Sequence, residues 1–257
     1  MDFKIGFNEI EIDALENKSV EAIWTYYNVQ DKLHHIVPDG RSDIIFTFDV
    51  RAGGELSNIR PIISPPFTKA HPLRVTAHQG FIGLRLRAGS AGIFLNIPLS
   101  KISGHLQYGK DAVQYIPWAE KVCKDKSSVT RLITNINQHV SKASSQVKSS
   151  MVADVVCLIH EAQGITRINE IAQQIKISER TINRVFTNAV GLSPKQFSSI
   201  IRLRRAIDCL NIPDYAVSSI ALDCGFADQA HMTREIKSYM GQTPSQLQKA
   251  LDTDTLL

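Results

Sequence analysis

INRVFTNAVGLSPKQF at residues 182–197 and MTREIKSYMGQTPSQL at residues 232–247 are two copies of one pattern, and this pattern decides the fold of the C-terminal half. The copies are offset by a constant 50 residues (234 − 184 = 50). Four pairs are identical at this offset: Arg184/Arg234, Gly191/Gly241, Pro194/Pro244 and Gln196/Gln246. A fixed offset over such a length predicts that the chain uses one supersecondary unit twice.

Each copy predicts an amphipathic helix that ends at a glycine and is followed by a second helix. The apolar residues recur at the spacing of one helix face: Ile182, Val185, Phe186, Ala189 and Val190, then Met232, Ile236, Tyr239 and Met240. Glu235 interrupts the second stripe. Glycine ends a helix readily because it takes the left-handed conformation at low cost. The Ser-Pro and Thr-Pro pairs that follow predict a capped start of the next helix.

The faces opposite the apolar stripes are predicted to point outward. Arg184 and Arg234 lie two residues, roughly 200°, from the first apolar anchor of each helix. At helical spacing they share their faces with Arg180, Asn183 and Thr187, and with Ala230, Thr233 and Lys237. Most of these side chains can hydrogen-bond bases or phosphates. A solvated face is the simpler interpretation, but two equivalent faces, each led by an arginine, favour DNA binding.

The order of elements around these helices predicts two helix-turn-helix units. Residues 168–175, a turn at 176–178 and the helix with Arg184 form the first; residues 217–223, 224–226 and 228–240 form the second. Residues 194–210 join them as a helix of roughly 25 Å. Such a bridge can hold two recognition helices about one DNA turn, ~34 Å, apart. A single chain is thus predicted to read two successive major-groove segments.

Composition predicts a soluble cytoplasmic protein. The chain has 257 residues and a net charge of +4, which permits a polyanionic partner without demanding one. No apolar run of about 18 residues predicts a membrane span, and the acidic start MDFKIGFNEIEID does not resemble a signal peptide. The four scattered cysteines, which lack metal-ligand spacing, are interpreted as small buried hydrophobic residues: Cys123, Cys157, Cys209 and Cys224.

Residues 1 to about 110 are predicted to be β-rich, because short apolar runs alternate with Gly/Pro turns. This pattern favours a sandwich or small barrel, which can hold a pocket. On one strand, Leu84 and Leu86 should face one way, and Arg85 and Arg87 the other. The two arginines would bind a carboxylate or phosphate if they faced inward. The outward, solubilising orientation is favoured roughly two to one.

Nothing in the sequence predicts catalysis or a cofactor. His34, His35, His71 and His78 all fall in the first half, but adjacent histidines on a strand face opposite sides. No HxH or carboxylate spacing accompanies these histidines, so the sequence disfavours metal binding there. No nucleophile elbow and no phosphate-binding glycine loop is found, so the chain is predicted not to be an enzyme.

A connector is predicted between the halves. Residues 127–143 carry one apolar stripe on a polar helix, which either packs on the barrel or pairs with its twin in a homodimer. The dimer is slightly favoured. The polar run 141–146 is predicted to be the linker. The predicted division is a β-rich domain at 1–125, the connector and linker at 126–146, and an all-α domain at 147–257, which begins with a helix at 147–160.

The second copy lies in IALDCGFADQAHMTREIKSYMGQTPSQL, which resembles the signature of the AraC/XylS family of bacterial transcription regulators in its GF, DQ, TR and TP elements. The upstream copy with RVF and GLSP is similar to the family's first motif. This resemblance covers residues 150–250. The N-terminal half, with HHIVPDGRSDIIF and GLRLRAGSAGIFLNIPLS, is similar to a sensor domain found in one branch, which implies a cupin-like barrel.

The resemblance implies DNA binding by both units and activation or repression of transcription. The implied DNA-contacting residues are Arg180, Thr181, Asn183 and Arg184, and then Gln229, Ala230, His231, Arg234 and Lys237. Three positions depart from the family pattern. Met232 and Ile236 stand where phenylalanine is common, which keeps the buried character. Ala230 stands where a small polar residue is usual, which thins readout by the second unit.

We expect a sequence-specific regulator whose N-terminal barrel senses a small molecule, with RNA polymerase as a further partner. The alternative is a ligand-independent regulator that is controlled by protein contact or abundance. An alkyltransferase-like enzyme fused to this DNA-binding half is disfavoured, because Cys123 is the one cysteine in the first 150 residues and cannot form a four-cysteine zinc site.

Overall fold

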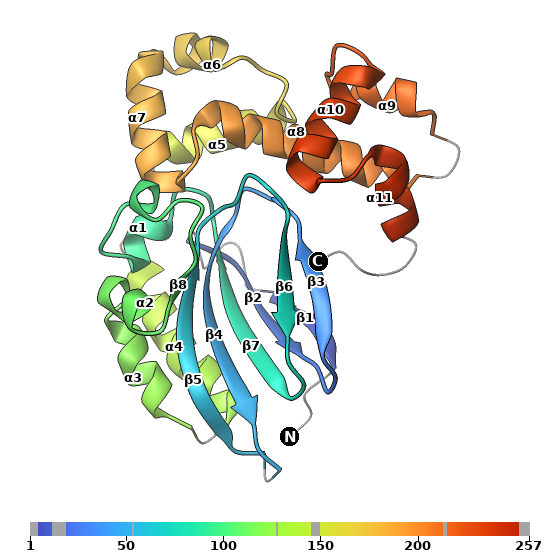
Figure 1. The fold of residues 1–257 in the computed structure, drawn as a ribbon. Helices are drawn as coiled ribbons and strands as arrows, with labels where there is room; N and C mark the ends of the chain where they lie inside the picture. Colours follow the sequence, from blue (N-terminus) through green and yellow to red (C-terminus); the bar gives the residue numbers. More distant parts are fainter. Residues whose placement is uncertain are drawn as a thin grey trace.

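The structure, a computed structural model, describes residues 5–11, 19–52, 54–126, 128–144, 150–212 and 215–251. An antiparallel sheet with helices on one face forms the N-terminal part, and the C-terminal part is helical (Figure 1). The predicted linker at 141–146 is wrong for residues 141–144, which end the helix Val129–Ser144, and residues 145 and 146 lie outside the described residues. Among the described residues, no helix combines the length and apolar character needed to span a membrane.

Among the described residues, the main sheet has six antiparallel strands in the order β1-β2-β7-β4-β5-β8. Their bounds are β1 Gly6–Glu11, β2 Val20–Tyr27, β4 Ser42–Val50, β5 Leu56–Ser64, β7 Gln79–Leu86 and β8 Gln107–Tyr108. A separate ribbon, β3 (Lys32–Ile36) with β6 (His71–Val75), lies in front of this sheet in Figure 1. Side chains alternate along β4. Ile44 and Phe46 therefore belong to the main core, while Ile45 packs on the other face, in a small cluster that includes Val75 of the ribbon.

The predicted barrel is not found among the described strands. β1 and β8 are the two edges of the main sheet, and no ladder joins them. A barrel closes by pairing its edge strands. Here β8 has only two residues, and helices rather than further strands cover one face (Figure 1). Beyond residue 86 the segment predicted to be β-rich contains one strand among the described residues, the two-residue β8, because short helices begin at residue 91.

In the part of the chain that the structure describes, four helices and one 3-10 turn cover the sheet. They are α1 Ala91–Phe94, η1 Leu99–Lys101, α2 Lys110–Tyr115, α3 Trp118–Lys124 and α4 Val129–Ser144. α4 corresponds to the predicted connector helix. Its apolar residues Leu132 and Ile136 are 0% exposed and belong to the same core as Phe46 and Leu84. The stripe therefore packs on the chain's own sheet, and the preference for a dimer through this helix is wrong.

The C-terminal part contains seven helices among the described residues. They are α5 Met151–Glu161, α6 Ile168–Ile175, α7 Glu179–Val190, α8 Pro194–Leu210, α9 Val217–Asp223, α10 Gln229–Met240 and α11 Pro244–Leu251. The predicted bounds of α8 and α9 are confirmed. The helix predicted at 147–160 begins at Met151, because Ser150 caps it by accepting a hydrogen bond from the Ala153 amide at 3.2 Å.

α8 joins two separate helical cores. Phe197 and Ile200, near its start, are buried with α5, α6 and α7. Leu203 and Ala206, further along, are buried with α9, α10 and α11. In Figure 1, α6 and α7 stand at one end of α8, with α9 and α10 at the other. Because both cores include side chains of α8, this one continuous helix connects the two helix pairs.

The cysteines are less uniform than predicted. Cys224 is buried, whereas Cys123 and Cys209 are only half-buried. Cys157 is exposed on α5, where its thiol donates to Glu161 Oε1 at 3.2 Å. The residues at 157 and 161 are one helical turn apart, so this polar contact holds the thiol at the surface.

Candidate nucleic-acid interface and ligand cavity

α7 is defined at both ends by local signals. Ser178 accepts a hydrogen bond from the Thr181 amide at 3.2 Å and so caps the first turn. Gly191 ends the helix in the left-handed conformation, at φ 83°. Ile182 and Phe186 are 0% exposed and Val190 is nearly so. This buried stripe fixes the rotation of the helix and turns the opposite face outward.

α10 repeats this construction 50 residues later. Asp228 Oδ1 accepts from the His231 amide at 2.6 Å, and Gly241 ends the helix at φ 72°. Met232 and Ile236 are fully buried, at the positions of Ile182 and Phe186. The physical repeat therefore extends to the caps and to the buried face.

Glu235, which interrupts the apolar stripe of α10, has a structural role. Its carboxylate accepts from Arg202 on α8 at 3.1 Å, and Arg202 lies 4.9 Å from the centre of the Phe226 ring. Both partners of the ion pair are largely buried. At the matching position of α7, Val185 packs in the first core. The second unit is thus attached to α8 by an ion pair where the first uses apolar contact.

The outward faces carry the predicted cations. Arg180 and Arg184 on α7, and Arg234 and Lys237 on α10, are exposed. No hydrogen bond or ion pair of these four side chains is found in the part of the chain that the structure describes. Gln229 and Ala230 are exposed at the start of α10. The two helices therefore present uncompensated positive charge, which attracts an anionic polymer.

Three of the predicted DNA-contacting residues are half-buried and already hydrogen-bonded within their own helices. The Thr181 hydroxyl lies 2.8 Å from that of Ser178, and Asn183 Nδ2 donates to the Glu179 carbonyl at 3.0 Å. His231 Nδ1 accepts from the Ala227 amide at 3.3 Å. These contacts position the first turn of each helix, so Arg184 and Arg234 are the freer groups.

The C-terminal end of α7 rests on the N-terminal part, which the sequence did not predict. Ser100 Oγ donates to Asn188 Oδ1 at 2.9 Å, and Ser103 Oγ donates to the Gly191 carbonyl at 2.6 Å. A cleft of about 530 Å³ lies beside this contact and includes Arg184 together with segment 92–98. One end of the exposed face of α7 therefore borders the sheet domain.

Substitution of Gly191 by alanine should destabilise the protein more than the same change at Gly241. Both residues have positive φ, so each alanine costs about 1 kcal/mol of backbone strain. A Cβ at Gly191 would also lie 3.2 Å from Leu99 Cβ, whereas one at Gly241 meets nothing within 4 Å. Urea unfolding of both variants measures the difference. Equal losses would mean that α7 does not rest on η1.

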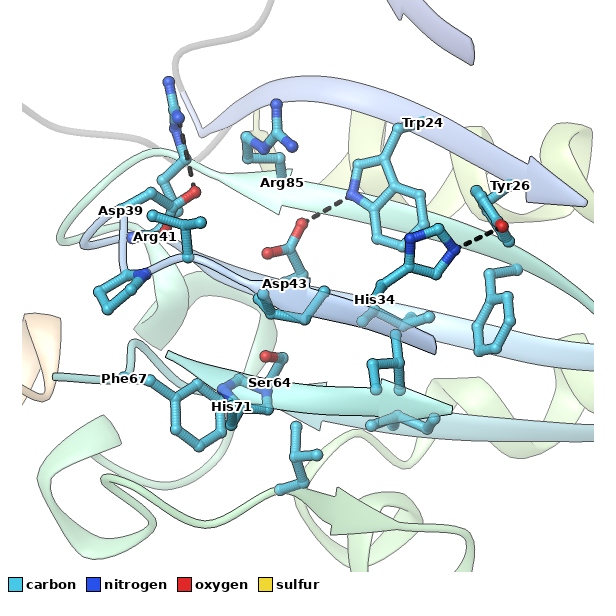
Figure 2. Close-up of a pocket in the computed structure, with 18 of the residues that line it drawn as sticks. Trp24, Tyr26, His34, Asp39, Arg41, Asp43, Ser64, Phe67, His71 and Arg85 are labelled. Carbon is cyan, nitrogen blue, oxygen red and sulfur yellow. Dashed lines mark hydrogen bonds and ion pairs between the residues drawn. The ribbon is translucent and has the colours of Figure 1, made fainter. Parts of the chain in front are cut away.

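A cavity of about 350 Å³ lies between the main sheet and the β3–β6 ribbon (Figure 2). Its floor is built from cross-strand neighbours. Asp43 on β4 stands opposite Ser64 on β5 and Arg85 on β7, and all three line the cavity. The next row along the sheet is apolar: Ile62, Ile45, Gly83 and Trp24. The cavity therefore has a polar end and an apolar, partly aromatic body.

Gly83 makes room for Trp24 in this apolar row. A Cβ at Gly83 would lie 2.0 Å from an atom of the Trp24 indole. The indole can therefore lie flat over the strand only if position 83 has no side chain. Trp24 Nε1 then donates to Asp43 Oδ1 at 2.8 Å (Figure 2), which links the aromatic wall to the polar end.

The two arginines of the predicted pair face different spaces. Arg85 lines the cavity and pairs with Glu9 at 2.8 Å, so the outward orientation favoured from the sequence is wrong for this residue. Arg87 follows the end of β7 and lines a cleft between the sheet and α8 instead. The two side chains do not form one anion site, because β7 has ended before Arg87. Leu84 and Leu86 are buried in the main core as predicted.

The histidines of the cavity are held neutral. Burial lowers the pKa of both His34 and His71. His34 Nε2 lies 2.6 Å from the Tyr26 hydroxyl (Figure 2). Among the described residues, no group of three or more His, Cys, Asp or Glu side chains is arranged to hold a metal ion. His34 and His71 therefore serve as polar positions in an apolar wall.

Stability should fall as Asp43 ionises. Burial raises the pKa of the Asp43 carboxyl to about 7, and Asp39 adds to this, while Trp24, Arg85 and Arg41 oppose it. The unfolded chain releases this proton near pH 4. The raised pKa of Asp43 therefore stabilises the folded chain fully below about pH 4. As the pH rises to about 7 this stabilisation is lost, and the free energy of unfolding falls by at most about 1.4 kcal/mol per pH unit. Urea unfolding of the wild type and Asp43→Asn across this range measures it. A constant difference between them would contradict the assignment.

The cavity also reaches the helical part. The β3–β4 loop packs on α8: Val37 belongs to the second helical core, and a Cβ at Gly40 would lie 2.8 Å from the Phe197 ring. Arg204 of α8 lines the cavity itself. A molecule bound in the cavity can therefore touch both parts of the chain.

Comparisons with known proteins match the two halves separately. A family model described as a helix-turn-helix domain matches residues 171–250. A second model, described as a domain of unknown function (DUF6597), matches residues 17–106. Each match lies within one of the two structural parts, because the sheet ends before residue 110 and the helix pairs begin after residue 160.

The curated relatives match over a limited length. The Msm operon regulatory protein of Streptococcus mutans is 26% identical over 117 residues, which are 45% of this chain and 42% of that protein. The HTH-type transcriptional activator RhaS of Escherichia fergusonii is 32% identical over 82 residues, which are 32% of this chain and 30% of that protein. The chain thus spans less than half the length of these relatives.

Matches to solved structures cover either most of the chain or its helical part. A 1.65 Å structure of ToxT from Vibrio cholerae is 11% identical, covers 95% of this chain and 98% of that chain, and has a TM-score of 0.44. The DNA-binding domain of AdpA, in complex with a target DNA, is 25% identical, covers 41% of this chain and 96% of that chain, and has a TM-score of 0.38.

Proposed function

The chain belongs to the AraC/XylS family of bacterial transcription regulators, and on that premise we propose that it is a sequence-specific DNA-binding regulator that reads two major-groove segments. α6–α7 and α9–α10 are then its two helix-turn-helix units, and α7 and α10 are the helices that enter the groove. One observation carries the proposal: α7 and α10 have equivalent, exposed faces that each bear an arginine, and α8 connects the two helices.

The proposed roles follow from exposure and chemistry. Arg184 and Arg234 donate to base edges, because a guanidinium bonds guanine at two atoms. Lys237 and Arg180 contact phosphate and position the helices. The remaining proposed contacts are Thr181, Asn183, Gln229, Ala230 and His231, of which Ala230 offers only a methyl group. Readout by the second unit is then centred on Arg234 and Gln229.

The proposed division of labour gives residues 147–257 to DNA and residues 1–125 to an effector, with 126–146 between them. Two observations support effector control. The cavity has apolar walls and a polar end, which is usual for small-molecule sites. It also shares Arg204 with the helix that carries both units. A regulator controlled by protein contact needs neither feature, and RNA polymerase is a proposed partner in both versions.

The proposal is tested by selecting DNA from the host genome with the purified full chain. We expect fragments that share a bipartite motif, with two parts about one helical turn, roughly 10 base pairs, apart. Affinity for the selected fragments is then compared with affinity for shuffled sequences of equal composition. Equal affinity for both sets would overturn sequence-specific binding.

Lys237→Ala should weaken binding to every DNA sequence by a similar factor. Loss of one phosphate contact releases about one counterion fewer, so the slope of log K against log [salt] should fall by about 1. Titrations at several salt concentrations measure this slope. Lys195→Ala is the matched control, because Lys195 is exposed at the start of α8, outside both reading helices. An unchanged slope for Lys237→Ala would place Lys237 away from the phosphates.

A further inference from the structure

Two ionisable groups in the cavity, Asp43 and Arg204, form no ion pair among the described residues. Asp43 accepts a hydrogen bond from Trp24 Nε1 at 2.8 Å, but no cation lies within ion-pair distance of its carboxyl among the described residues. Arg204 lines the same cavity from α8, and no hydrogen bond or ion pair of its guanidinium is found in the described ranges. One acid and one base therefore remain to be matched.

The other charges that line the cavity are already compensated. Arg41 donates to both Glu21 oxygens, at 2.6 and 3.1 Å, and lies 3.5 Å from Asp39. The charge of Arg85 is paired with Glu9 at 2.8 Å, although the buried Arg85 Nε has no hydrogen-bond partner among the described residues. A ligand gains little by competing with these pairs, because breaking one leaves a desolvated charge behind. Its own charges are better matched to Asp43 and Arg204.

The rest of the cavity selects an apolar body. Trp24, Ile45, Ile62 and Phe67 line it with aromatic and aliphatic surface, and Trp24 lies flat against Gly83. The volume of about 350 Å³ has room for a molecule the size of a large amino acid. The polar floor at Asp43 and Ser64 adjoins this surface directly, so the charged head and the apolar body of a ligand must be close together.

We propose that the cavity binds a small zwitterion of the amino-acid type with an apolar side chain. The ammonium group pairs with Asp43, the carboxylate pairs with Arg204, and the side chain lies against Trp24. A plain carboxylic acid would leave Asp43 unpaired and add a second negative charge near it. A plain amine would leave Arg204 unpaired. An uncharged sugar would match neither group.

The contact with Arg204 gives this ligand a route to DNA binding, a consequence that rests on the proposed function. Both helix pairs pack on α8, so a carboxylate bound to Arg204 contacts the helix that determines the placement of the two pairs relative to each other. A ligand whose ammonium group is held by the sheet and whose carboxylate is held by α8 favours one placement of the two parts.

Calorimetric titration of the full chain at pH 7 tests the ligand class without DNA. The probes are leucine, methionine, phenylalanine and tryptophan, together with 3-phenylpropionate and 2-phenylethylamine, which each lack one charge of phenylalanine. We expect saturable binding of at least one amino acid. If this includes phenylalanine, both analogues should bind at least about tenfold more weakly, because each loses a charge-assisted bond. If another amino acid binds, its deaminated and decarboxylated analogues replace them.

Two variants assign the two charges. In Asp43→Asn the preference for the amino acid over its deaminated analogue should disappear, and in Arg204→Gln the preference over its decarboxylated analogue should disappear. Arg205→Gln is the control: Arg205 donates to the Asp223 carbonyl at 2.7 Å and does not line the cavity, so affinity should stay unchanged. Arg204 is half-buried at the cavity's edge, so its variant serves even if Asp43→Asn folds poorly.

The proposal is overturned if none of the four amino acids binds saturably. It is also overturned if an acid or amine analogue binds as tightly as its amino acid, or if Arg204→Gln leaves both affinities unchanged. These outcomes are distinct from failure of the proposed function, since selection of a bipartite DNA motif is measured without any ligand. A chain that selects DNA but ignores amino acids would keep the regulator and lose the ligand class.

Discussion

Replacing both Arg184 and Arg234 by alanine is expected to weaken specific DNA binding by about 2–6 kcal/mol. Each arginine contributes about 1–3 kcal/mol of base discrimination when it bonds guanine at two atoms. The two residues lie on α7 and α10, which pack in different cores, so their losses should add. Gel-shift titration on a selected site, against the single variants, measures the sum.

Arg131→Ala provides the matched control for charge. Arg131 is a 72% exposed arginine of α4, in the sheet domain, and it lies 3.6 Å from Asp125. Its removal changes net charge by the same amount as either single variant, away from α7 and α10. Each single variant of Arg184 or Arg234 should also relax preference at a different position of the site. If the double variant kept the affinity and sequence preference of the wild type, neither arginine would read bases.

Phe186→Ala should have the largest effect on stability, a loss of about 3–5 kcal/mol. The ring is 0% exposed, and its centre lies 5.5 Å from that of Phe197 in an edge-on arrangement. Truncation leaves a cavity between α7 and α8 and loosens the face that orients Arg184. Urea unfolding followed by helical circular dichroism measures the loss, with the exposed Lys195→Ala as reference. A loss below about 1 kcal/mol would mean that the first core does not hold α7 in place.

The helical half was predictable because its signals are local. Apolar spacing, a hydroxyl or acid cap and a terminal glycine all act within one or two helical turns, and the ends of α7 and α10 follow from them. Glu235 shows where this reasoning stops. From its position, the sequence predicted only that Glu235 interrupts the apolar stripe. Its ion pair could not be predicted, because the partner Arg202 lies 33 residues earlier on another helix.

The cavity was not predictable in the same way, because strand register creates it. Asp43 meets Ser64 and Arg85 only after β4 pairs with two strands that are distant in sequence. Arg204 comes from the other half of the chain. One signal was present: Asp43 is an acid directly before the apolar run Ile44–Phe46, on a strand that is otherwise largely suited to burial. The inward orientation of Arg85 follows from the same alternation that buries Leu84 and Leu86.

The most direct test of the central claim is a footprint of the full chain on a selected DNA site, compared among the wild type, Arg184→Ala and Arg234→Ala. For the wild type we expect two protected major-groove segments that lie about one turn, roughly 10 base pairs, apart. We also expect each variant to lose base-specific contacts in a different segment. A single protected segment, or loss of contacts in the same segment for both variants, would contradict the reading of DNA by two equivalent helices of one chain.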